Sequence, residues 1–287
     1  MAIIITYENE YGQSVEFSKN SGLQISSISD LSSNTITISS ATSAGQVGTT
    51  VTGQKIEPKT MTIEGAYRYD PLVRRKLIDT ILPGVNARFH YEDLDAGIDA
   101  YLEGCPTMTP KLSDNPFWQN FQFDFYCPYP YWKDQSGGLL EFVSYESAFK
   151  FPRSFSSTVQ WKITKKTINQ LSYISNTGSV PVGFVARFKA KDDVIGPELL
   201  KVLTQEVIRF SDLEMQVGDT LIVSTIDNDR YCRLIRSGIE TNVFFDMDFD
   251  SSFFKLDVGE NPLRFDAADG YENLDVSIEY YVTYAGV

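Results

Sequence analysis

The chain contains few residues whose types and spacing could support catalysis. Its 287 residues include one histidine, His90, so any Ser-His-Asp or Cys-His arrangement would have to use this side chain. His90 falls on the polar face of an expected strand, between Arg88 and Glu92, where a solvated or interface histidine is far more common than a catalytic one. We therefore expect no catalytic residue and predict that the protein is not an enzyme.

An acidic triplet is the best candidate for a metal site. Asp246, Asp248 and Asp250 alternate with apolar residues, as they would on one face of a strand. Clustered carboxylates favour calcium, but alternate residues of a strand lie about 7 Å apart, which is too far for one ion without help. A solvated sheet face is the better interpretation. The three cysteines and the single histidine also lack the spacing of zinc ligands, so we expect no metal and no cofactor.

The charge balance argues against nucleic acid as a ligand. The 25 basic and 38 acidic residues give a formal charge of −13, and an acidic surface repels phosphates but lets DNA move past it. The apolar start of the chain lacks the basic leader and cleavage site of a signal peptide, and no segment has transmembrane length. We expect a protein that is folded and assembled in a cytoplasm, without membrane insertion.

One helix is expected in the first half of the chain. Asp70 is a natural N-cap, Pro71 suits the first helical position, and Pro83-Gly84 ends the helix. Its apolar stripe consists of Val73, Leu77, Ile78, Ile81 and Leu82. Strands are expected around it, at 60–64, at 86–92 and near Tyr101. This mixture predicts an α+β domain.

A basic run lies on this helix, at Arg74, Arg75 and Lys76. The simplest interpretation is the solvated back of an amphipathic helix. If copies of the chain form a ring, the same face becomes a candidate subunit interface that meets an acidic neighbour.

A strictly alternating segment ends the first domain. Four residues share one face, which predicts a half-buried strand: Phe121, Phe123, Phe125 and Cys127. Pro128 and Pro130 then stop the strand. The aromatic residues at this stop are candidates for an interdomain joint, with stacking on sugar as the alternative: Tyr129, Tyr131 and Trp132. We therefore expect a first domain at 1–135 and a second at 136–287.

Residues 26–52 are rich in Ser, Thr and Gly, which by composition suggests a linker. Within them, Thr35–Ser39 alternates with β-branched residues, as a short strand would. An extended hairpin or arm agrees with both observations.

The second half carries many short strand patterns separated by Gly, Asn and Asp turns. Expected strands lie at 158–163, 184–189, 221–223, 231–234 and 276–284, with one short helix near Glu198–Leu203. This pattern predicts a β-sandwich or jelly roll, so the fold class of the whole chain is mainly β.

The order of these segments resembles the distal tail proteins of siphophages that infect Gram-positive bacteria, within the phage tail protein family. In the first half the similar segments are Met61–Gly65, Leu72–Leu82, Phe89-His90-Tyr91, Tyr101–Gly104 and Phe121–Phe125 running into Cys127–Trp132. In the second half they are Asn176–Gly178 followed by Pro181, Gly218–Leu221, Phe254–Pro262 and Tyr284–Gly286. The order of the motifs is more specific than any one of them.

The resemblance implies a structural component of a phage or prophage virion tail tip. Its first domain would have a tail-tube-like fold whose copies form a hexameric ring around the DNA channel, with the Ser/Thr-rich arm at 26–52 reaching neighbouring subunits. Its second domain would be a galectin-like β-sandwich. The implied partners are the tail tube protein and a tail-associated lysin, fibre or receptor-binding protein, with DNA passing through the hub unbound.

A binding function is the alternative. The second domain could be a carbohydrate-binding module that recognises host cell-wall saccharide, which would require a concave face with exposed aromatic and polar side chains. An enzyme that degrades polysaccharide is a third hypothesis, but no pair of carboxylates stands out for it.

Overall fold

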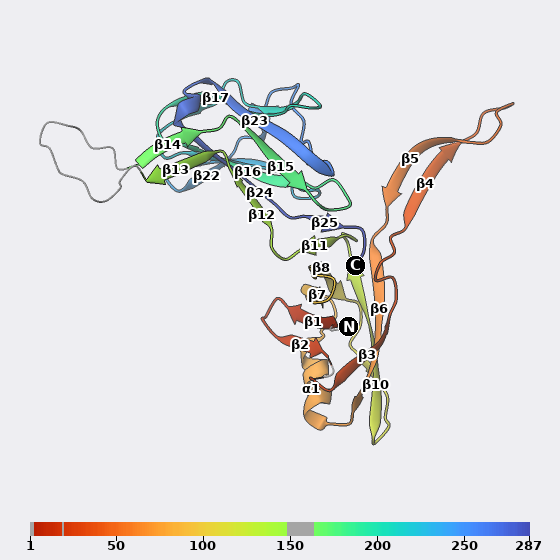
Figure 1. Cartoon of the computed structure of the whole chain (residues 1–287). Helices are drawn as coiled ribbons and strands as arrows, with labels where there is room; N and C mark the ends of the chain where they lie inside the picture. Colours follow the sequence, from red (N-terminus) through yellow and green to blue (C-terminus); the bar gives the residue numbers. More distant parts are fainter. Residues whose placement is uncertain (1–2, 19, 148–163) are drawn as a thin grey trace, which may run out of the picture. The chain divides into compact units, whose positions relative to one another are not determined.

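The computed structural model describes residues 3–18, 20–147 and 164–287. The chain divides into two compact units, Met1–Ser136 with Thr283–Val287, and Gly137–Val282 (Figure 1). The boundary after Ser136 lies next to the expected one. The last five residues differ from the expectation, because their strand β25 (Thr283–Tyr284) pairs with β11 (Trp132–Asp134) of the first unit.

The first unit is a β-sheet with one helix. The main path of its sheet runs β2-β1-β7-β8-β10-β6-β3, and β9, β11 and β25 attach to it. The bounds of these strands are β1 Ile3–Asn9, β2 Ser14–Phe17, β3 Leu23–Ile28, β6 Lys59–Arg68, β7 Ala87–Asp93, β8 Ile98–Pro106, β9 Lys111–Leu112 and β10 Trp118–Cys127.

Strand β10 confirms the alternation that predicts a half-buried strand. Its inward residues are fully buried: Phe121, Phe123, Phe125 and Cys127. Phe123 lies opposite Ile63 of β6, and Tyr7 of β1 packs edge-on against Phe123 with ring centroids 6.1 Å apart. The core of this unit is therefore largely aromatic, which supplies a large buried apolar area from few residues.

The helix α1 (Pro71–Thr80) begins as expected. The Asp70 side chain accepts a hydrogen bond from the Leu72 amide at 2.8 Å, and Pro71 occupies the first turn. Leu77 and Ile81 are fully buried, whereas Ile78 is exposed. The apolar stripe is thus narrower than the sequence predicts, because only one side of this short helix faces the sheet.

The Ser/Thr-rich segment at 26–52 only partly coincides with a hairpin, since its residues 26–28 belong to β3 of the sheet and the hairpin covers 36–56. Strands β4 (Ile36–Ala41) and β5 (Thr50–Ile56) pair antiparallel with each other and with no other described strand (Figure 1). We call residues 36–56 the arm.

The second unit contains two antiparallel sheets that share one apolar core. One has the order β12-β24-β16-β20-β21-β22, and the other β15-β23-β17-β18 with β19 attached to β17. Phe142, directly after β12 of one sheet, and Phe265 of β23 in the other meet in this core with ring centroids 5.3 Å apart. The unit is therefore a β-sandwich, as expected. A separate pair, β13 with β14, completes its described strands.

The bounds in this unit are β12 Gly138–Glu141, β13 Val143–Ser147, β14 Thr164–Ile168, β15 Leu171–Asn176, β16 Phe184–Ala190, β17 Val194–Lys201, β18 Glu206–Arg209, β19 Glu214–Met215, β20 Thr220–Ser224, β21 Tyr231–Arg236, β22 Ile239–Asn242, β23 Gly259–Asp269 and β24 Leu274–Tyr280. Two short 3-10 turns, Phe244–Asp246 and Tyr271–Asn273, complete the unit.

Two sequence predictions in this unit are wrong. The helix expected at 198–203 is strand β17 as far as Lys201, because pairing with β18 and β23 outweighs the helix-forming tendency of its residues. The strand expected through the acidic triplet is a 3-10 turn and an irregular loop. The strand expected at 158–163 lies outside the described residues.

Among the residues that the structure describes, no cluster of His, Cys, Asp or Glu side chains could hold a metal ion. Within the same residues, none of the helices has the length and apolar character needed to cross a membrane.

Candidate functional site

The single histidine lies on the outer face of β7. His90 stacks beside Tyr101 with ring centroids 5.7 Å apart, and its Nε2 is 3.8 Å from the Glu8 carboxylate, beyond hydrogen-bond distance. Burial lowers the pKa of His90, so the ring is neutral at neutral pH. The described surroundings therefore present His90 as a packed sheet residue.

Two of the cysteines are buried in the cores. Burial raises the pKa of the Cys127 and Cys232 thiols to about 12, so both stay protonated at neutral pH. A protonated, buried thiol is a poor nucleophile and a poor metal ligand. These cysteines act as small apolar side chains of the two cores.

The basic run separates into three different environments. Arg74 turns towards the sheet and donates a hydrogen bond to the Gln119 side-chain oxygen at 2.9 Å, which also accepts one from the Tyr67 hydroxyl. Arg75 forms an ion pair with Asp79 one turn along the helix, with 2.7 Å between Arg75 Nε and the Asp79 carboxylate. Lys76 is exposed. Arg75 and Lys76 are thus both exposed candidate interface residues, but the charge of Arg75 is already paired with Asp79.

The aromatic residues after β10 also have different environments. Trp132 is fully buried in the core of the first unit, and its ring centroid is 5.9 Å from that of Tyr91. The rings of Tyr129 and Tyr131 meet edge-on, with their centroids 5.4 Å apart. The described contacts of Trp132 all belong to the first unit, so its packing stabilises that unit itself.

Trp132 also secures the base of the arm. Its Nε1 donates a hydrogen bond to the Leu31 carbonyl at 3.0 Å, and Lys59 Nζ donates to the same oxygen at 3.3 Å. Lys59 is almost fully buried, and burial lowers its pKa. Sequence reasoning missed Lys59. Its position two residues before Met61, on the inward face of β6, was the available indication.

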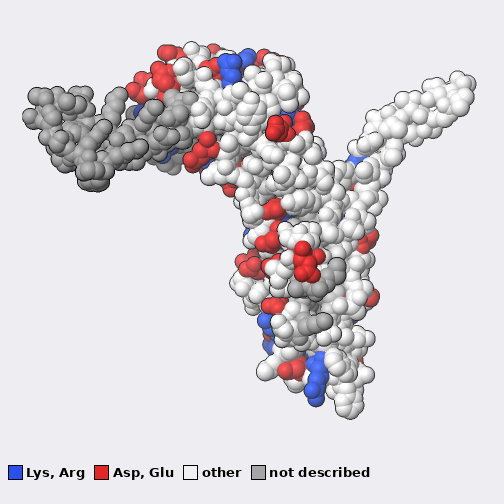
Figure 2. All heavy atoms as spheres, in the orientation of Figure 1, with Lys and Arg blue, Asp and Glu red and all other residues white. Residues whose placement is uncertain are grey.

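The arm is exposed along both strands and carries no charge over most of its length. Residues 31–54 contain no Asp, Glu, Lys, Arg or His, and Figure 2 shows the hairpin with almost no charged atoms. In the register of the arm, Ile36 lies opposite Ile56 and Ser40 lies opposite Val51. This pairing places four β-branched residues on one face of the hairpin: Ile36, Ile38, Val51 and Ile56. All four are more than 40% exposed.

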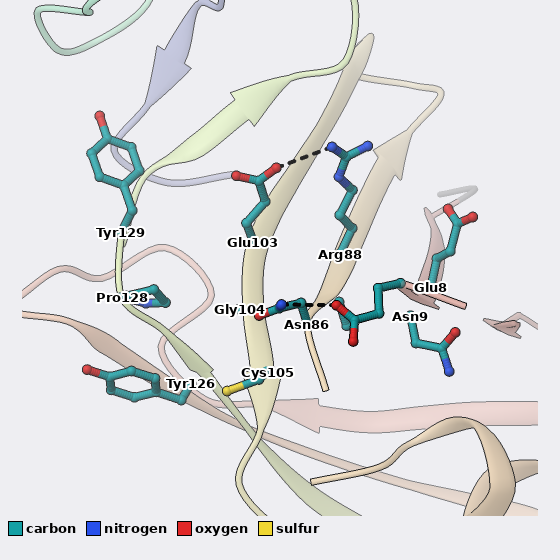
Figure 3. Close-up of a pocket in the computed structure, with 12 residues that line it drawn as sticks. Glu8, Asn9, Asn86, Arg88, Glu103, Gly104, Cys105, Tyr126, Pro128 and Tyr129 are labelled. Atoms are coloured by element: carbon teal, nitrogen blue, oxygen red, sulfur yellow. Dashed lines mark hydrogen bonds and ion pairs between the residues drawn. The ribbon is translucent and has the colours of Figure 1, made fainter. Parts of the chain in front are cut away.

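A pocket of about 600 Å³ lies on the outer face of the first unit, over the ends of β1, β7, β8 and β10 (Figure 3). Its charged groups largely satisfy one another. Glu103 contacts Arg88 at 3.3 Å and Lys133 at 2.6 Å, and Asn86 donates a hydrogen bond to Glu10 at 3.0 Å. Although burial raises the pKa of Glu103, the hydrogen bonds and charges of Lys133 and Arg88 together outweigh this and lower it. The pocket is therefore an internally paired surface without an evident reactive group.

A family model for the C-terminal domain of siphovirus-type tail components matches residues 177–284. No curated protein matches the chain.

Solved structures extend the similarity to the whole chain. The Dit protein (gp 19.1) of phage SPP1, described as a paradigm of the hub adsorption apparatus in phages that infect Gram-positive bacteria, is similar with a TM-score of 0.64 and 12% identity, over 97% of this chain and 98% of that one. A chain of the phage P2 baseplate in its activated conformation with Ca is similar with a TM-score of 0.51 and 13% identity, over 100% of both chains.

These similarities show that the chain has the β-rich fold of SPP1 Dit. More particularly, residues 177–284 match the family model for the C-terminal domain of siphovirus-type tail components. The resemblance to siphophage tail proteins inferred from the sequence is thereby confirmed. For the first unit, at 12% identity, the similarity is one of fold.

Proposed function

We propose that this chain is a structural hub at the tip of a siphophage tail, which joins the tail tube to tail-tip or baseplate proteins and lets DNA pass. The family match over 177–284 carries this proposal. The similarity to SPP1 Dit across 97% of the chain extends it to the first unit. The protein would act by shape and self-contact in the virion, without catalysis or a cofactor.

We infer that copies of the chain assemble through the arm. A two-stranded hairpin alone is only marginally stable in water, and its apolar face gains from being covered. Each strand of the arm is paired on one side only among the described residues, so a neighbour can add a strand or pack on the apolar face. A head-to-tail contact of this kind closes into a ring when its rotation divides a full turn. The family resemblance favours six subunits.

The charge of the chain suits a channel for DNA. Residues 1–136 contain 16 acidic and 10 basic residues, a formal charge of −6, so a lumen lined by the first domain would be acidic and would repel passing phosphates. In the same ring, Lys76 would be free to meet an acidic group on a neighbour. A strongly basic lumen in the assembled ring would contradict this part of the proposal.

Negative-stain microscopy of the concentrated protein tests the assembly. We expect rings with a central hole for the wild type. We expect their loss when Ile36→Ser and Ile38→Ser are combined on the apolar face of the arm. Thr37→Ala with Ser39→Ala changes the opposite face of the same strand and should leave the rings intact.

Two results would contradict the role of the arm. One is a wild-type chain that stays monomeric at every concentration, and the other is equal ring formation by both double variants. Circular dichroism on each variant establishes that its sandwich and sheet are folded.

A further inference from the structure

The second unit carries an aromatic loop from which two phenylalanine side chains face solvent. This loop, residues 243–254, follows β22 and contains five phenylalanines. Phe245 is 92% exposed and Phe249 is fully exposed. Removing a phenylalanine side chain from water is favourable, so two exposed phenylalanines on one loop form a strong candidate for a contact surface.

The loop is held in a defined conformation. The Asp248 amide donates to the Arg209 carbonyl at 2.9 Å, and the Ser252 amide donates to the Val207 carbonyl at 2.8 Å. The Asp248 carboxylate also accepts a hydrogen bond from the Ser211 amide at 2.9 Å. The backbone is thus fixed to the end of β18 at several points. A partner that binds here would not have to order the loop first.

The aromatic rings form a connected cluster. Phe244 stacks on Phe253 with centroids 5.8 Å apart, and Phe245 meets Phe244 edge-on at 5.8 Å. The guanidinium of Arg230 lies 5.9 Å from the Phe253 ring centroid. Phe245 is therefore supported from behind by packed rings, as expected of a rigid anchor residue.

The charge of the loop limits the kind of partner. Residues 242–254 contain Asp246, Asp248 and Asp250 but no lysine or arginine. Anionic lipid headgroups would be repelled, and a second copy would bring the same acidic loop on a chain of formal charge −13.

The loop chemistry also disfavours a saccharide. Phenylalanine offers no hydrogen bond. The Asp248 carboxylate is already bound to Ser211, and the Asp250 carboxylate lies 3.5 Å from Arg209. Sugar sites instead need several converging polar groups that are available to the ligand.

We propose that the aromatic loop is a docking site for a different protein, whose surface offers apolar pockets for Phe245 and Phe249 and a rim of lysine or arginine for the exposed Asp246 carboxylate. Apolar anchors surrounded by complementary charge are the arrangement of many protein interfaces. This site is separate from the arm, so it does not depend on ring assembly.

Selection from a displayed library of random peptides tests the proposal with the full-length chain as bait. We expect enriched peptides that combine apolar residues with Lys or Arg. Their affinity should fall by roughly tenfold or more for Phe245→Ser combined with Phe249→Ser. The charge reversal Asp246→Lys should weaken the same peptides. A matched control, Leu203→Ser with Val217→Ser, removes two other exposed apolar side chains of this unit and should leave binding unchanged.

Thermal unfolding of the second unit shows that each variant is folded before binding is compared. The proposal is overturned if no enriched peptide depends on the two phenylalanines, or if the dependent peptides are acidic. Phenylalanine-dependent binding to a panel of saccharides would overturn it in favour of a sugar site. Phenylalanine-dependent self-association in sedimentation would assign the loop to contacts between copies. Loss of rings in the arm variants leaves all these outcomes unaffected.

Discussion

His90 is half-buried on the outer face of β7, where Glu8, Arg88, Asp99 and Tyr101 surround it. Burial is the largest influence and lowers its pKa below the ordinary value of 6.5. The unfolded chain therefore binds the His90 proton more tightly than the folded chain does. The contribution of neutral His90 to stability is fully present above pH 6.5 and is lost as the pH falls through its folded pKa.

We therefore expect acidification to destabilise the first unit through His90. Urea unfolding between pH 8 and pH 5.5 should show a larger fall in the free energy of unfolding for the wild type than for His90→Gln. Because the chain has one histidine, this comparison isolates a single group. Parallel stability curves for the two proteins would contradict the prediction.

Gly104 shows why a small residue is needed where β8 approaches β10. A Cβ atom at this position would lie 2.2 Å from the Tyr126 carbonyl oxygen, which belongs to the backbone and cannot rotate away. We expect Gly104→Ala to destabilise the first unit by about 1–3 kcal/mol in urea unfolding, because the sheet must shift to relieve the overlap.

Gly53→Ala is the matched control for this substitution. Its Cβ would meet only the Ser39 Cβ, at the ordinary distance of 4.0 Å. It should change stability by less than about 1 kcal/mol. Equal effects of the two substitutions would show that the approach of β8 to β10 is not tight.

At the scale of elements, α1 depends on its N-cap. The Asp70 carboxylate satisfies the Leu72 amide, one of the unpaired amides at the start of the helix. Asp70→Ala should lower the free energy of unfolding by about 1 kcal/mol, measured by urea titration. Asp114→Ala removes a more exposed carboxylate that lies 3.8 Å from Arg74, and it should have a smaller effect. A larger effect for Asp114 would contradict the capping role.

The arm combines a fixed attachment to the first unit with an exposed apolar face. Its base is fixed through the Leu31 carbonyl by Trp132 and Lys59, whereas its strands expose β-branched residues. A firm attachment with an uncovered apolar face is what an element that joins subunits needs, and the ring test above addresses it.

At the scale of the molecule, the chain passes between its units twice, after Ser136 and again before Thr283. Thr283 is almost fully buried, and the Asn34 side chain donates a hydrogen bond to the Ala285 carbonyl. The last strand of the sequence is therefore part of the first unit.

Truncation after Val282 should destabilise the first unit selectively, because β11 loses its partner β25. Hydrogen exchange should accelerate in peptides that cover β11 and residues 31–34, while peptides from the sandwich core keep their protection. Faster exchange confined to the second unit would contradict this assignment.

Features that depend on neighbours in the sequence could be predicted from it. The alternation of buried and exposed residues in β10 involves only neighbouring residues, because strand periodicity follows from backbone geometry. The N-cap and the proline of α1 likewise lie next to the helix that they start. The same local reasoning failed at β17, where helix-forming residues lie in a strand because two partner strands complete its hydrogen bonds. It also failed for the acidic triplet, where contacts with β18 hold an irregular loop.

By itself the sequence determined a mainly β protein with a capped helix after Asp70 and a Ser/Thr-rich arm, because periodicity, capping and composition are properties of adjacent residues. Only the tertiary structure decided that Lys59 and Trp132 share the Leu31 carbonyl, that β25 returns to the first unit, and that Phe245 and Phe249 face solvent. These arrangements join residues far apart in the chain, and their free energy comes from contacts that exist only after folding.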